Sequence, residues 1–296
     1  ARAGADVVFL ARGTHLMALR RDGLRVDSVD GDFTVSPVRA AATVEEAHAL
    51  LSGPPDVALV CVKTFHLAGA LEKLATLAGP ETVIIPMLNG VEAADQIARA
   101  VGAQRVAAGT CRIVAYKAGP GHVVHVAAAP SISFGPLADT APSLRERLER
   151  LRDAFTTAGV PVTLTDDINR VLWAKFVFVA GYGAVGAAAS VPVGLLRQTP
   201  ESRALLERAF VEVYSIARAR GVELAEDTPA RTLAYLDALA GEAVSSLQRD
   251  LEAGRPTEFD AWVTAVIRLG VEAGVSTPLF DVLHGLLRPR VRATSA

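Results

Sequence analysis

The sequence predicts an α/β protein of two domains, with a parallel-sheet domain over residues 1–165 followed by an all-helical domain over residues 166–296. Three observations lead to this prediction. Short apolar runs alternate with amphipathic stretches through the first half, which is typical of βαβ units. After Asp166-Asp167 the pattern is helical to the end. A chain of 296 residues is also long enough for about two domains.

The expected strands of the first half are short runs rich in apolar and β-branched residues. They cover residues 6–10, 57–62, 82–88 and 161–164, with weaker signals over 23–38 and turn-separated strands over 106–137. The run over 57–62 is continuously apolar, which predicts a strand covered on both faces.

Amphipathic spacing predicts helices between these strands, over residues 14–21, 43–51, 67–77, 93–101 and 144–159. Thr43 with Glu46 three residues later predicts a capping box. The Ala-rich start before Gly4 is typical of a last helical turn and its C-cap. The uncharged segment 176–196 is long enough to span a membrane, but its glycines and Pro192 favour one fully buried helix.

Composition narrows the classes of partner. Thirty basic against 32 acidic residues give a net charge of −2, which argues against nucleic-acid binding through bulk positive charge. Two cysteines, Cys61 and Cys111, are too few for a disulfide framework and favour a reducing, cytoplasmic setting. His122 and His125 face opposite sides of an expected strand, so we expect no metal site there. We expect no membrane partner either.

Three polar residues follow expected strands, at the edge where open parallel sheets bind ligands. Arg12 suits a 2′-phosphate because a guanidinium makes bidentate contacts, although a solvated loop arginine is the plain alternative. Lys63 could neutralise a phosphate or a carboxylate, or simply end its strand. Asn89, followed by Gly90, could donate to and accept from a ligand, or form an ordinary turn.

Two further candidates lie in the second half. Lys175 is the only charge between Arg170 and Arg197, so its amine either reaches water or sits in a pocket where it can donate a proton. Glu258 could pair with Lys175 or bind a hydroxyl, and it could equally be a carboxylate at the start of a helix.

Five motifs occur in a telling order: Ala11-Arg12-Gly13, Val60-Cys61-Val62-Lys63, Leu88-Asn89-Gly90-Val91-Glu92, Leu172-Trp173-Ala174-Lys175-Phe176, and Ser245-Ser246-Leu247-Gln248-Arg249-Asp250 followed by Gly254-Arg255-Pro256-Thr257-Glu258-Phe259-Asp260. With them the chain resembles the ketopantoate reductase (2-dehydropantoate 2-reductase) family. The resemblance implies a Rossmann-type domain, a helical C-terminal domain, and NADPH-dependent reduction of a 2-oxo acid, with 2-dehydropantoate giving pantoate in pantothenate biosynthesis.

The resemblance also assigns roles to residues. It implies that Lys175 is the general acid that protonates the ketone oxygen. It implies substrate contacts from Asn89, Ser246 and Glu258, and cofactor contacts from Arg12, Lys63, Asn89 and Glu258.

The sequence departs from the family in two places. The glycine-rich turn that holds the cofactor pyrophosphate would lie ahead of Gly4, so we expect this chain to leave a gap between the second and fourth strands and to bind cofactor poorly. Val179 and Gly183 stand where ketopantoate-specific members tend to carry asparagines, which predicts a more apolar 2-oxo acid as substrate. A binding module with impaired catalysis and an opine-type dehydrogenase are the alternatives. The apolar stretch 177–196 also suggests a homodimer.

Overall fold

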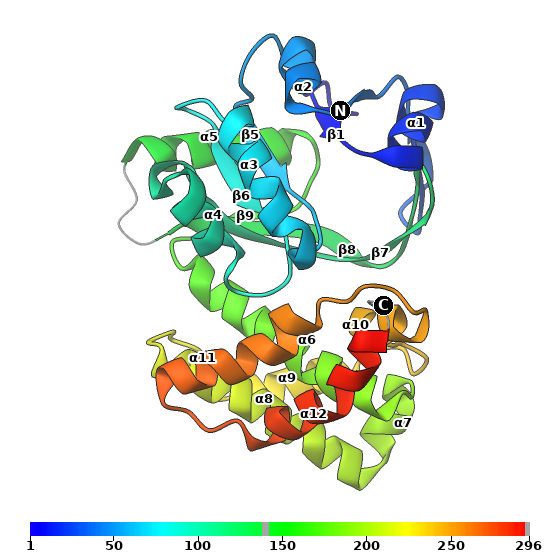
Figure 1. Ribbon diagram of the computed structural model, residues 1–296, viewed down its shortest axis with the longest axis vertical. Helices are drawn as coiled ribbons and strands as arrows, with labels where there is room; N and C mark the ends of the chain where they lie inside the picture. The colour runs from blue at the N-terminus through cyan, green and yellow to red at the C-terminus, as the bar shows by residue number, and fades with distance from the viewer. Residues whose placement is uncertain (138–141, 294–296) are drawn as a thin grey trace. The chain divides into compact units, whose positions relative to one another are not determined.

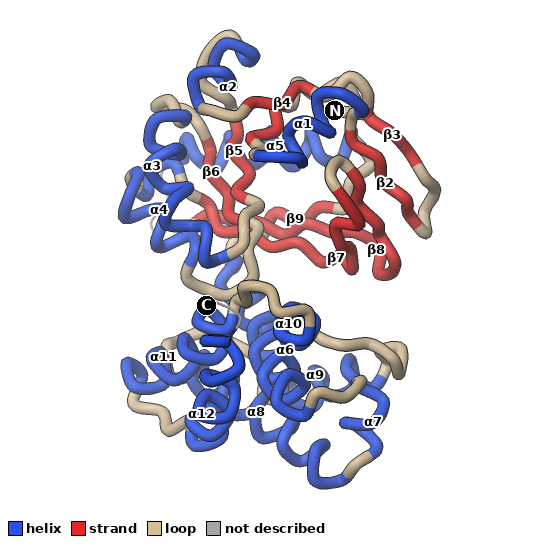
Figure 2. Tube along the Cα trace, turned by 45° about the vertical axis from the view of Figure 1, so that its right-hand side comes forward, coloured by secondary structure: helices blue, strands red, loops and turns tan. Residues whose placement is uncertain are grey.

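The computed structural model describes residues 1–137 and 142–293, which form two units. The first unit comprises residues 1–62, 66–87 and 93–168. The second comprises residues 63–65, 88–92 and 169 onward. Figure 2 shows the strands gathered in the first unit, while the second consists of helices and loops. The predicted fold class, a Rossmann-like domain followed by a helical domain, is confirmed.

In the first unit, strands that alternate with helices form two parallel pairs. Strand β1 (Val8–Leu10) pairs with β4 (Arg39–Ala41), and β5 (Val57–Val60) pairs with β6 (Val83–Pro86). The accompanying helices are α1 (Gly13–Asp22), α2 (Val44–Leu51), α3 (Leu67–Leu77) and α4 (Ala93–Val101). Within the described ranges β1 and β5 have no strand partner beyond these, so the two pairs are separate sheets.

A third, mixed sheet completes the first unit. Its strands are β2 (Leu24–Ser28), β3 (Phe33–Val35), β7 (Ala107–Gly119), β8 (His122–Pro136) and β9 (Val162–Leu164). They follow the order β3-β2-β8-β7, with β9 parallel to β8. Helix α5 (Pro142–Thr157) buries Leu144 and Leu148 in a core with Phe134 of β8 and Ile85 of β6.

Two local expectations about the first unit need correction. The Thr43 hydroxyl does cap α2, accepting from the Glu46 amide at 3.3 Å. The Glu46 carboxylate, however, accepts from the Ala42 amide at 2.8 Å, so the reciprocal half of the capping box lies one residue earlier. The strand over 57–62 is not covered on both faces, because Leu59 is 42% exposed and burial along β5 alternates.

The second unit is built from seven α-helices and one π-helical turn within the described part. They are α6 (Ile168–Ala189), α7 (Val193–Gln198), α8 (Pro200–Ala219), α9 (Thr228–Asp237), α10 (Ser246–Glu252), the π turn η3 (Asp260–Thr264), α11 (Ala265–Ala273) and α12 (Pro278–Ala293). Figure 1 traces them from green through yellow to red. Their apolar faces share one core, to which α6 contributes Phe176, Val177, Ala180 and Val185.

Helix α6 explains the long uncharged segment. By length and composition it could cross a membrane, but 67% of its apolar window is buried inside the protein. The segment is not one helix to residue 196, as expected. Helix α6 ends at Ala189, Ser190 takes a left-handed conformation with φ of 55°, and Pro192 caps α7. The break falls here because proline cannot donate an amide proton to a continuing helix.

Candidate functional site

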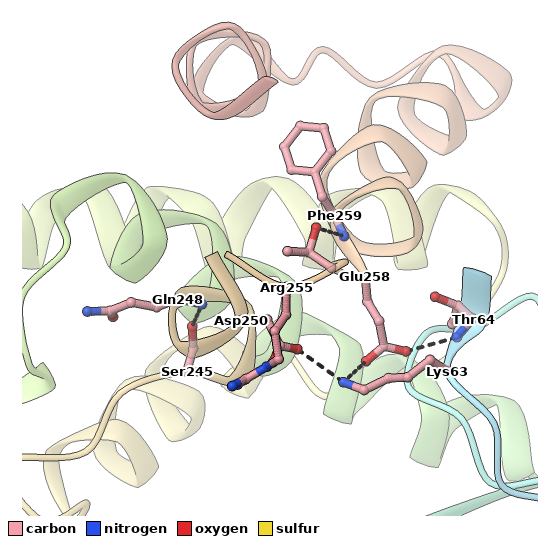
Figure 3. Close-up of polar contacts among 9 residues, drawn as sticks. Lys63, Thr64, Ser245, Gln248, Asp250, Arg255, Glu258 and Phe259 are labelled. Carbon is pink, nitrogen blue, oxygen red and sulfur yellow. Dashed lines mark hydrogen bonds and ion pairs between the residues drawn. The ribbon is translucent and has the colours of Figure 1, made fainter. Parts of the chain in front are cut away.

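Lys63 leaves the end of β5 and joins the second unit. Its segment, Lys63–Phe65, belongs to the helical unit. The ammonium Nζ lies 3.2 Å from Oε2 of Glu258 and 3.3 Å from Oδ2 of Asp250. Dashed lines mark both contacts in Figure 3. Two predicted site residues that are 195 positions apart in sequence are thus in direct contact.

Glu258 is a buried carboxylate with every oxygen engaged. Its side chain is only 5% exposed, while that of Lys63 is 44% exposed. The second oxygen, Oε1, accepts from the backbone amide of Thr64 at 3.2 Å. A buried carboxylate is costly unless it is paired and hydrogen-bonded, and the ammonium and the amide supply both. Each oxygen still has a lone pair with which to accept from a ligand hydroxyl.

Asp250 completes this cluster, and the sequence interpretation assigned it no role. Its Oδ1 accepts from Nε and Nη2 of Arg255, at 3.0 and 2.8 Å. The backbone amide of Arg255 also donates to the Asp250 carbonyl, at 2.8 Å. The available signal was an acid and an arginine on either side of the Gly254 turn, inside the stretch that carries the family resemblance.

The two adjacent serines differ in what their hydroxyls do. The Ser245 hydroxyl caps α10 by accepting from the Gln248 amide at 3.1 Å. Ser246, the predicted substrate ligand, is half-buried, and its hydroxyl makes no hydrogen bond to the residues that the structure describes. It is therefore available to a bound molecule.

The loop before Ser245 is held by α6 and α7. The Tyr182 hydroxyl donates to the Ala243 carbonyl at 2.9 Å, and the Val193 amide donates to the same oxygen at 2.9 Å. Burial raises the pKa of Tyr182 to about 12, against a small opposing effect of Arg249. The phenol therefore remains a hydrogen-bond donor at neutral pH.

Asn89 and Arg12 make no hydrogen bond to the Lys63 cluster among the residues that the structure describes. Asn89 lies in segment Leu88–Glu92 of the second unit, which is tied to α11 by two 2.6 Å bonds from Arg268 to Glu92. Its side chain is half-buried and has no hydrogen-bond partner in the described part of the chain. Arg12 is exposed just before α1 in the first unit, and within residues 1–137 and 142–293 nothing pairs with its guanidinium.

Lys175 is half-buried on α6. It lies between Trp173 and Phe176, two buried residues whose rings meet edge to face at 5.7 Å. Val179 and Gly183 follow at one-turn intervals, so the three positions share one side of the helix. Neither of the latter two carries a side chain that can hydrogen-bond.

A glycine pattern inside α6 imitates a nucleotide-binding turn. Residues 181–186 read Gly-Tyr-Gly-Ala-Val-Gly, which matches G-x-G-x-x-G by letters. They lie within a helix instead of following a strand. Side chains of the second-unit core occupy the space that β carbons would need: a β carbon on Gly181 would come within 2.5 Å of Phe210, and one on Gly183 within 2.9 Å of Trp262. These glycines serve close packing.

Comparison with known proteins settles the family. Models of the ketopantoate reductase PanE/ApbA family and of its C-terminal domain match residues 1–139 and 167–291. The solved 2-dehydropantoate 2-reductase of Geobacter metallireducens GS-15 is 31% identical, with a TM-score of 0.88 over 97% of this chain and 93% of that one. The chain belongs to the ketopantoate reductase family. The family resemblance drawn from the motifs is thereby confirmed.

Two further known proteins are similar to this member of the ketopantoate reductase family over most of its length. The 2-dehydropantoate 2-reductase of Mesorhizobium japonicum is 29% identical over 96% of this chain and 89% of its own length. A D-mandelate dehydrogenase solved with NADH and anilino(oxo)acetate has a TM-score of 0.87, covering 100% of this chain and 94% of that one, and at 20% identity it shares the fold. The chain is thus a member of an oxidoreductase family.

Proposed function

We propose that this chain reduces a small 2-oxo acid to the 2-hydroxy acid with NADPH. The contact between Lys63 and Glu258 carries the proposal, because it unites a strand-end cation with a helical-domain carboxylate. Both are positions that the resemblance assigns to ligand binding. Membership of the ketopantoate reductase family supports the reaction type.

The residues fit a phosphorylated nicotinamide nucleotide. Arg12 follows β1 with an unpaired guanidinium among the described residues, and a guanidinium can hold a 2′-phosphate through two bonds. An acidic residue at that strand end would instead favour the free 2′-hydroxyl of NAD. Glu258 would accept from a ribose hydroxyl, with Lys63 and Asn89 beside the reacting end.

Lys175 is the proposed proton donor. When bound, the reduced nicotinamide supplies a hydride to C2 of the 2-oxo acid. As that C–H bond forms, the C=O π bond breaks and the oxygen takes a proton from the Lys175 ammonium. The neutral amine left behind later regains a proton from solvent. The ammonium stabilises the developing alkoxide more than the ketone oxygen, so it lowers the barrier. The apolar surroundings of α6 strengthen this effect because they lower the local dielectric.

Substrate contacts are proposed for Asn89, Ser246 and Glu258. The free hydroxyl of Ser246 and the free amide of Asn89 in the described structure suit a carboxylate or an oxo group. Val179 and Gly183 add no polar group on the Lys175 side of α6. The proposed substrate therefore carries an apolar side chain on its 2-oxo acid group.

The test is a panel of 2-oxo acids, including 2-dehydropantoate, branched aliphatic and aromatic members, followed by the loss of NADPH absorbance. Lys175→Met should lower kcat by about 100-fold or more in protein that remains folded by circular dichroism. No NADPH oxidation with any member would overturn the proposal. Tight NADPH binding by calorimetry without turnover would instead identify a binding module, and turnover only with an added amine would identify an opine-type dehydrogenase.

A further inference from the structure

We propose that Asp250 is a positioning residue for Lys63, holding the ammonium in place while Glu258 accepts a hydrogen bond from a hydroxyl of the bound ligand. The inference rests on the proposed function, in which Lys63 and Glu258 both meet the cofactor. Asp250 itself touches neither ligand nor reacting atoms, and it acts through the lysine.

The lysine needs such a partner. Its Nζ is shared almost equally, 3.2 Å from Glu258 and 3.3 Å from Asp250. An ammonium has three N–H donors on a flexible four-carbon stem, and the Lys63 side chain is 44% exposed. One carboxylate would hold it in one direction only. Two carboxylates on different sides fix its position and leave its third N–H for a ligand.

Asp250 is suited to be the permanent partner. Its side chain is 14% exposed, at the end of α10. Oδ1 takes both bonds from the Arg255 guanidinium, and the Arg255 amide closes a ring onto the Asp250 carbonyl. This leaves Oδ2 for Lys63, a contact that a dashed line marks in Figure 3. The Arg255 guanidinium therefore already has Asp250 as its hydrogen-bond partner.

Glu258 is suited to be the exchangeable partner. Two cations and two carboxylates balance the cluster formed by Lys63, Arg255, Asp250 and Glu258. Without the Asp250 charge, Lys63 would turn wholly to Glu258, and a ligand hydroxyl would have to compete with a full ion pair for the same oxygen. Loss of Asp250 should therefore weaken ligand binding and leave proton donation by Lys175 unaffected.

The experiment compares Asp250→Asn with a matched control, Asp237→Asn. Asp237 also accepts two hydrogen bonds from one arginine, although on both of its oxygens: Nη1 of Arg203 donates to Oδ1 at 2.7 Å and Nη2 donates to Oδ2 at 2.8 Å. The described structure gives Asp237 no lysine partner. We expect Asp250→Asn to raise the KM and Kd for NADPH about tenfold, in line with loss of a charged hydrogen bond, with kcat within about twofold. Asp250→Glu should recover most of the affinity, and Asp237→Asn should change neither constant.

A second readout needs no turnover. The chain has only four lysines, so the NH₃⁺ signal of Lys63 can be assigned by ¹⁵N NMR with Lys63→Arg. We expect this group to become more mobile in Asp250→Asn and to keep its wild-type order in Asp237→Asn. Unchanged order in Asp250→Asn, or a fall in kcat at constant KM, would overturn the inference. If wild-type protein oxidises no NADPH, the proposed function fails, and the NMR comparison still decides whether Asp250 positions Lys63.

Discussion

The indole of Trp262 lies against Gly183 so closely that a β carbon at position 183 would come within 2.9 Å of Cε3 and 3.1 Å of Cζ3. Trp262, in the π turn η3, is only 2% exposed. The two residues are matched, since the ring fills the space beside α6 that any side chain at 183 would need. This contact explains why position 183 carries no amide: an asparagine there would displace the indole.

Gly183→Ala should therefore lower the free energy of unfolding by about 1–3 kcal/mol, the usual cost of overpacking a core. Urea unfolding measures it. The matched control is Gly285→Ala, in helix α12 with nothing within 4 Å of the added carbon, which should stabilise by roughly 0.5–1 kcal/mol. Combining Gly183→Ala with Trp262→Leu should recover part of the loss, because the two sites are in contact. Equal effects at 183 and 285 would contradict the packing described.

Substitutions at the two adjacent serines should have different effects: on stability at Ser245 and on the substrate KM at Ser246. Ser245→Ala removes the acceptor for the Gln248 amide and should cost about 1 kcal/mol of stability, the usual worth of an N-cap. Ser246→Ala removes no hydrogen bond within the described structure, so it should leave urea unfolding unchanged and raise the substrate KM. The two variants serve as controls for each other. A stability loss in Ser246→Ala with an unchanged KM would reverse the assignment.

Replacing Lys63 should destabilise the fold more than replacing Glu258, although the two side chains form one ion pair. Lys63→Met leaves the 5% exposed Glu258 carboxylate with only the Thr64 amide, so it should destabilise by about 1–3 kcal/mol. Glu258→Gln should cost less, because Lys63 keeps Asp250 and Thr64 keeps an oxygen acceptor. Denaturant unfolding of both variants at neutral pH measures the difference. A larger loss in Glu258→Gln would mean that burial of the carboxylate is not what Lys63 compensates.

The local pattern of apolar residues was enough to predict many of the helices and strands. Helices α3 and α4 begin and end at the residues that their apolar spacing predicts, because that signal lies within each helix. The exposure of Leu59 could not be predicted in this way, since it depends on what covers β5 in the folded chain. The break at Ser190 was missed because low charge over 176–196 outweighed the proline within it.

The site could be predicted one residue at a time, but its contacts could not. Lys63 and Glu258 each had a plain alternative interpretation, and only folding brings their side chains within 3.2 Å. Asp250 lay inside a recognised motif, yet its link to Lys63 spans 187 positions and leaves no local signature. The Trp262 contact with Gly183 is of the same kind, because glycine alone does not say which neighbour fills its space.

Tyr182 predicts a loss of stability at high pH. Burial raises its folded pKa from 10.0 to about 12, so the folded state resists ionisation of the phenol. Its contribution is complete below pH 10 and disappears as the pH rises toward 12, because the unfolded state releases the proton first. The loss should be on the order of 3 kcal/mol once the pH has passed the folded pKa.

Urea unfolding between pH 9 and about 11.5 checks this, with Tyr182→Phe as the comparison. The variant should lose about 1 kcal/mol at pH 8, since the Ala243 carbonyl keeps only the Val193 amide as donor. Its unfolding free energy should then fall less steeply than that of the wild type above pH 10, so that the two curves converge. Parallel curves across that range would show that the Tyr182 phenol ionises equally easily in both states, and that its bond to Ala243 does not anchor the loop before Ser245.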